Sequence, residues 1–76
     1  MTHLPVAITP DHWIVQVFSA RSAAEGGIVR RQVADVERLV GRDRFLKEIH
    51  KRGYRAVENA GQIIVFCNSE PVQLLR

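Results

Sequence analysis

The first concentration of apolar residues lies between His12 and Phe18, where side chains such as Trp13 and Ile14 would occupy both faces of an extended chain. β-branched and aromatic residues in a short run of this kind are typical of a strand. The preceding Thr9-Pro10-Asp11 has the composition of a turn. We therefore expect an irregular lead-in over residues 1–11, followed by the first strand.

Residues 28–40 allow two interpretations. The spacing of their valines, four, three and four residues apart, is typical of one side of a helix. Residues 28–33, however, follow a glycine pair and are β-branched at both ends, which favours a second strand that pairs with the first. Both interpretations stay open, with the strand slightly favoured. In that case Asp35 is the expected N-cap of a helix that begins at Val36.

The pattern over residues 36–52 predicts a helix, and Gly53 supplies the left-handed residue that commonly follows a helix end. On a straight helix Phe45 would lie opposite the apolar face formed by Val36 and its neighbours. A break or kink at Gly41, with Asp43 as a new N-cap, removes this conflict. The residues expected to reach the core from this segment are Leu39, Leu46 and Ile49.

Two strand-like segments, residues 54–59 and 62–67, flank Ala60-Gly61, which suits a tight hairpin turn. The second segment is apolar on both faces, so we expect it to be central in its sheet. Residues 69–76 form either a short edge strand or a frayed tail. The predicted fold is a single α+β domain over residues 1–76, roughly ββαββ, with a central helical segment packed on an antiparallel sheet of three to four strands.

Composition narrows the class of protein. The chain has 76 residues, of which 46% are hydrophobic and 25% charged, as in a folded globular domain. One cysteine excludes an intrachain disulfide and a cysteine-based zinc site, and it suits a reducing compartment, so we expect a cytoplasmic protein. No run approaches the roughly 20 apolar residues of a membrane span, so we expect no membrane partner.

No pattern of catalytic residues is present. The three histidines are dispersed and lack the spacing of a metal site. Asp43 and Glu48 each precede a basic residue by four positions, Lys47 and Arg52 respectively, which predicts surface ion pairs rather than an acid and base pair. We therefore expect a protein that is not an enzyme and that holds no metal or cofactor.

Charge is distributed unevenly along the chain. Residues 30–55 contain nine Lys or Arg against four acids, a balance of +5, whereas the remaining residues carry −2. A basic face is expected to bind polyanions. We therefore predict non-catalytic binding of DNA or RNA by a ridge in which the first and last residues flank a helical face: Arg42, Arg44, Lys47, Lys51 and Arg55. The alternative is a protein-interaction module or small homodimer that does not bind nucleic acid, with the ridge as a solvated surface.

Two family layouts are similar to parts of the chain. A helix, a break at Gly41, a second helix and a hairpin over residues 33–66 resemble the end of a winged helix-turn-helix. This resemblance implies that the second helix enters the major groove and that the hairpin is the wing. The family's first helix is expected to be missing, and Glu37 replaces its usual small residue. The segment FLKEIHKRGYRAVENAGQIIVF is similar in layout to HicA-type mRNA interferases, but Gln62 stands where their histidine follows the turn glycine, so their nuclease chemistry is not expected.

Overall fold

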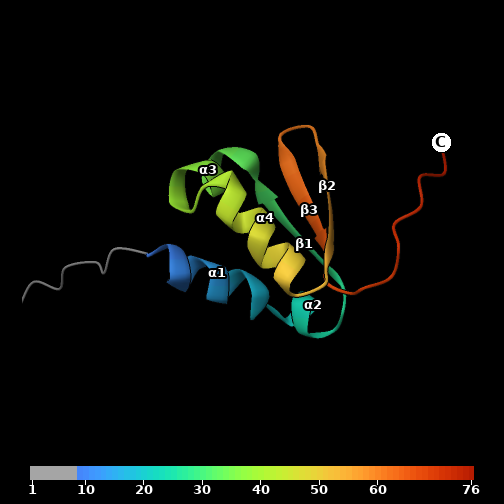
Figure 1. Cartoon of the computed structure of the whole chain (residues 1–76), viewed down its shortest axis with the longest axis horizontal. Coiled ribbons are helices and arrows are strands. Elements are labelled where there is room, and N and C mark those ends of the chain that lie inside the picture. Colours follow the sequence, from blue (N-terminus) through green and yellow to red (C-terminus); the bar gives the residue numbers. More distant parts are fainter. Residues whose placement is uncertain (1–8) are drawn as a thin grey trace, which may run out of the picture.

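A three-stranded antiparallel sheet with helices on one of its faces makes up residues 9–76, the part of the chain that the computed structural model describes (Figure 1). The α+β class is thus confirmed. Expectations for residues 1–8 lie outside the described residues. The elements, in chain order, are α1 (Pro10–Phe18), α2 (Arg21–Ala24), β1 (Ile28–Gln32), α3 (Val33–Leu39), α4 (Arg42–Lys51), β2 (Arg55–Asn59) and β3 (Gln62–Phe66).

The expected first strand is wrong, because this segment is the helix α1. Thr9 caps it, since its hydroxyl oxygen accepts a hydrogen bond from the His12 amide at 3.1 Å, and Pro10 occupies the first helical turn, where a proline costs no hydrogen bond. The Thr-Pro pair therefore begins a helix instead of ending a lead-in at residue 11. Three apolar residues then fall on one helical face and are buried: Trp13, Ile14 and Val17.

Residues 28–32 form the strand β1, as the favoured interpretation predicted, but its partner is β3 and not residues 12–18. The order of elements therefore departs from ββαββ. The following helix α3 begins at Val33 with Gln32 as its N-cap, three residues before the expected start. Asp35 is inside the first turn of α3, so its predicted role as N-cap is wrong.

The break at Gly41 is confirmed. Helix α3 ends at Leu39 and α4 begins at Arg42, and Gly41 between them has φ +96° and ψ 139°, a conformation that favours glycine. Gly41 is itself the N-cap, so the prediction for Asp43 was wrong. Because the chain changes direction here, Val36 and Phe45 both point into the core with no exposed surface.

The hairpin and the position of its second strand are confirmed. Strands β2 and β3 are joined by Ala60 and Gly61, both at positive φ, and β3 is central in the order β1-β3-β2. Residues 71–76 have no regular structure, so the alternative of a further edge strand is wrong. None of the helices within residues 9–76 has the length and apolar character needed to cross a membrane.

One cluster of buried side chains joins the helices to the sheet. Phe45 lies at its centre, with its ring 5.7 Å from that of Trp13 and 5.9 Å from that of Phe18, between centroids. Ile49 is buried and Leu39 packs against the cluster, as expected, whereas Leu46 is 40% exposed. Leu46 follows Phe45 on the same helix, and the 100° turn between consecutive residues directs its side chain away from the core.

Candidate nucleic-acid interface

One side of helix α4 packs against the core, and the opposite side is exposed. Its buried residues Phe45 and Ile49 are four positions apart and therefore lie on one side of the helix, against the core. The opposite side is exposed and forms a shallow depression lined by Asp43, Leu46, Lys47, His50 and Lys51. We call this surface the outer face of α4. It combines two ammonium groups, an imidazole and a carboxylate within two helical turns.

The side chain of Arg42, the first residue of α4, contacts α3 and β2 and is not part of the outer face. Its guanidinium donates hydrogen bonds to Glu58 on β2 at 2.7 Å and to Glu37 on α3 at 3.3 Å. These contacts raise the pKa of Arg42, chiefly through the hydrogen bond to Glu58, and the same bond lowers the pKa of the Glu58 carboxyl. Arg42 thus joins three elements, and its charge is balanced by two carboxylates.

The side of α4 that faces α1 is also occupied by ion pairs. Arg44 pairs with Asp11 in the first turn of α1. One turn further along, the expected pair of Glu48 with Arg52 is confirmed, and the hydrogen bond from Arg52 lowers the pKa of Glu48. The Arg52 guanidinium carbon also lies 4.4 Å from the centre of the Phe18 ring, a cation–π contact. These contacts attach α4 to α1.

Lys47 and Lys51 remain on the outer face without an ion-pair partner among residues 9–76. The expected pair of Asp43 with Lys47 is not formed, although the two residues are one turn apart. No carboxylate of the described residues therefore ties either ammonium to the protein. Of the predicted ridge, these two residues are the ones that the structure brings together and leaves available.

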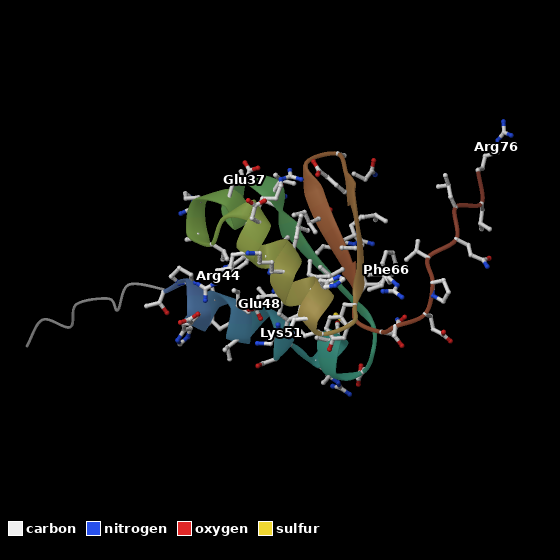
Figure 2. The ribbon with its side chains drawn as sticks, viewed as in Figure 1. Glu37, Arg44, Glu48, Lys51, Phe66 and Arg76 are labelled. Carbon is white, nitrogen blue, oxygen red and sulfur yellow. The ribbon has the colours of Figure 1, made fainter. Side chains whose placement is uncertain are left out.

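Arg55 is separated from the rest of the predicted ridge. It pairs in register with Phe66 of β3, and the two side chains lie on the sheet face away from α4. Figure 2 shows Arg44 and Lys51 on the helical side and Phe66 on the far side of the sheet. Tyr54, which adjoins the ridge in sequence, instead contacts the Phe18 ring at 5.9 Å between centroids. The basic residues thus occupy several surfaces and not one ridge.

The described residues offer neither a cluster of metal ligands nor an exposed cysteine. Within residues 9–76 no three His, Cys, Asp or Glu side chains are grouped closely enough to hold a metal ion. Cys67, directly after β3, is buried in the core, and burial raises the pKa of its thiol, which disfavours the reactive thiolate. Sequence reasoning missed helix α1 and the carboxylates Asp11, Glu37 and Glu58. These carboxylates form the ion pairs of Arg42 and Arg44.

Comparisons with protein-family models, with curated proteins and with solved structures gave no match to the chain.

Proposed function

We propose that the protein binds duplex DNA without catalysis, with α4 as the helix that enters the major groove and the β2–β3 hairpin as a wing beside it. The observation that carries this proposal is the outer face of α4, where Lys47 and Lys51 are exposed and unpaired in the described structure while the opposite side of the helix is fixed in the core. A rigid helix with one free cationic side is the usual element for reading the major groove.

The arrangement of elements supports the resemblance to a winged helix-turn-helix. The first helix that the resemblance lacked is α1, which packs against α4 through Trp13 and Phe45. Helices α3 and α4 are separated by the short turn at Gly41, and the hairpin follows α4 directly (Figure 1). Strand β1, between the first helix and the helix pair, adds a third strand to the hairpin. The resemblance concerns the arrangement alone, and DNA binding is supported by the side chains of the outer face.

The side chains of the outer face divide into two roles. Ammonium groups at Lys47 and Lys51 suit phosphate oxygens on the edges of the groove. Asp43 and His50 offer an acceptor and a donor for base edges, and Leu46 offers an apolar contact for a thymine methyl group. Arg42 acts indirectly, because its bonds to Glu37 and Glu58 hold the helix pair and the hairpin in a fixed relation.

Duplex DNA is favoured over duplex RNA because the deep, narrow major groove of A-form RNA excludes a helix. The residues that line the outer face include no Phe, Tyr or Trp, whereas proteins that bind single strands stack the bases on such side chains. A cytoplasmic DNA-binding role also agrees with the single reduced thiol.

The test is the affinity for a pool of random-sequence DNA duplexes, measured by fluorescence anisotropy at several salt concentrations. For the double variant Lys47→Ala/Lys51→Ala, we expect weaker binding and a log–log salt slope shallower by about 0.9 for each lost phosphate contact. The matched control is Arg21→Ala/Arg76→Ala, which removes the same charge from exposed positions on α2 and in residues 71–76.

The control variant is expected to keep the affinity and slope of the parent protein, because Arg21 belongs to α2 and Arg76 lies beyond β3, so neither is part of the outer face of α4. Equal losses in both double variants would mean that net charge, and not this surface, governs binding. Unchanged binding by the lysine variant would exclude the outer face as the site. A-form RNA duplexes of the same length are expected to bind more weakly than the DNA pool.

A further inference from the structure

The sheet has a second face that no described helix covers. Helices lie on the side of Val29, Ile63 and Val65, which are buried (Figure 1). On the other side, an apolar stripe crosses all three strands: Ile28 on β1, Phe66 and Ile64 on β3, and Val57 on β2. Ile28 is 45% and Val57 is 38% exposed. Figure 2 shows that Phe66 points away from the helices.

The polar residues around the apolar stripe are basic or neutral, and none is acidic. Arg30 pairs with Ile64 and Arg55 with Phe66, so one guanidinium flanks the stripe on each edge strand. The last row across the sheet consists of amide side chains, Gln32, Gln62 and Asn59. No carboxylate occurs among these nine positions. Aromatic residues and arginine with few acids or lysines are typical of protein interfaces. The guanidinium groups of Arg30 and Arg55 make no ion pair among residues 9–76, which favours a partner that carries a carboxylate.

A segment with the complementary composition follows the sheet in the same chain. Residues 70–75 read Glu-Pro-Val-Gln-Leu-Leu, a carboxylate followed by three apolar side chains. Leu74 is 91% and Leu75 is 90% exposed, and the segment has no regular structure. Exposed apolar side chains that no described residue covers thus occur at two places on one chain, as is typical of surfaces that bind a protein partner.

The structure directs this segment away from its own sheet. The side-chain nitrogen of Asn68 donates a hydrogen bond to the Gly26 carbonyl at 3.0 Å, and the side-chain oxygen of Asn68 accepts one from the Glu70 backbone amide at 3.0 Å. These two bonds fix the turn that follows β3. Beyond Pro71 the chain runs outward from the body of the molecule (Figure 1).

We propose that residues 70–75 of one copy cover the apolar stripe of a second copy, and that the reciprocal contact completes a two-fold homodimer. Residues 71–76, extended at about 3.3 Å each, reach about 20 Å, which suffices to cross a three-stranded sheet with strands roughly 4.8 Å apart. Val72, Leu74 and Leu75 lie on the stripe, and Glu70 lies near Arg30 or Arg55 of the other copy. Each copy gives one segment and receives one, as a two-fold interface requires.

This dimer does not depend on the proposed DNA binding, because the apolar stripe and the outer face of α4 lie on opposite sides of the sheet. The two are nevertheless compatible. A two-fold dimer would present two α4 helices, and paired helices of this kind bind two half-sites about one helical turn, roughly 34 Å, or a multiple of it apart.

The dimer is tested by sedimentation and light scattering of the full chain over a range of concentrations. We expect twice the mass of one chain for the parent protein. Leu74→Asp/Leu75→Asp changes the donated segment and Val57→Lys changes the stripe; each should weaken dimerisation by at least about tenfold, since burial of one such side chain is worth about 1.4 kcal/mol or more. Val15→Lys, at a residue of α1 that is 59% exposed, is the control and should leave the dimer intact.

Mixing the two variants identifies the contact. The Leu74/Leu75 variant keeps a normal stripe and the Val57 variant keeps a normal segment. A mixture should therefore form a heterodimer with one intact contact, at concentrations where the weakened dimer of each variant alone has dissociated. Isotope-filtered NMR on a mixture of labelled and unlabelled parent protein should show contacts between Leu74 methyls of one copy and the Phe66 ring of the other. A parent protein that stays monomeric, a dimer that survives both variants, or Leu74 contacts within one copy would each overturn the proposal.

Discussion

Arg42 and Arg44 show how contacts between elements determine the charge that a ligand meets. The spacing of Arg44, Lys47 and Lys51 along a helix is a local property, and it follows from the sequence once the helix is recognised. The partners that neutralise the arginines are not local: Asp11 lies 33 positions from Arg44, and Glu58 lies 16 from Arg42. No periodicity in the sequence relates such positions. Of the predicted ridge, Lys47 and Lys51 are the residues that lie together on α4 without an ion-pair partner in the described structure.

Acid is expected to destabilise the fold through Glu48 and Glu58. Hydrogen bonds from Arg52 and Arg42 hold the pKa of these carboxyls below their ordinary value of 4.5. A lowered folded-state pKa stabilises the protein above the unfolded-state pKa, and this contribution is lost as the pH falls through the folded-state value. The melting temperature should therefore fall between about pH 5 and pH 3.

The melting temperature of Glu58→Gln should depend less on pH over this window, and it should lie below that of the parent protein at neutral pH. Glu25→Gln is the control, because the ion pair of Glu25 with Arg21 lies at the surface with both side chains mostly exposed, where such a pair contributes little. If Glu58→Gln and the parent protein show the same acid dependence, the contact between Arg42 and Glu58 does not stabilise the fold in solution.

Phe45 is the residue on which the core depends most. Its ring has no exposed surface and contacts both Trp13 and Phe18 of α1. Phe45→Ala should lower the free energy of unfolding by about 3–5 kcal/mol, because it leaves a cavity between α1 and α4. Urea denaturation followed by tryptophan fluorescence measures this loss.

Val15→Ala in α1 is the comparison for Phe45→Ala, since Val15 is exposed and should change the free energy of unfolding by no more than about 0.5 kcal/mol. Comparable losses in the two variants would contradict the central position of Phe45.

At the scale of the elements, α1 and α4 show where a pattern of apolar residues suffices and where it does not. A short run such as residues 12–18 is apolar on both faces of a strand, and it equally supplies Trp13, Ile14 and Val17 to one face of a helix. The N-cap at Thr9 and the proline in the first turn favour the helix. The apolar residues of α3 and α4 conflict with one straight helix over both segments, and the glycine at the point of conflict made the break predictable.

Gly41→Ala should destabilise the protein by about 1–3 kcal/mol, the usual strain for a residue with a Cβ in a conformation reserved for glycine. A Cβ at Gly41 would have no atom within 4 Å, so backbone strain and not a clash is the cause. Thermal unfolding followed by circular dichroism measures the change.

Ala60→Gly is the matched control for Gly41→Ala. Ala60 already has φ +51°, so glycine relieves strain there while it adds freedom to the unfolded chain, and the two effects nearly offset. If Gly41→Ala is as stable as the parent protein, the turn between α3 and α4 does not require glycine.

On the scale of the whole molecule, the sheet divides two surfaces of different character. The helical side offers the outer face of α4, and the far side offers the apolar stripe. The α+β class, the hairpin and the central position of β3 were predictable, because turn residues and the two-sided apolar strand are local signals. The pairing of β1 with β3 was not, because it depends on residues 12–18 forming a helix and leaving the sheet to the later strands.

The most direct test of DNA binding by α4 is an amide NMR titration of the protein with a short DNA duplex at two salt concentrations. We expect saturable shifts over residues 43–51 and at the hairpin around residues 58–62, which weaken at the higher salt concentration. Residues of β1 and residues 71–76 should shift little. An absence of shifts at low salt, or shifts confined to the apolar stripe, would contradict DNA binding by α4.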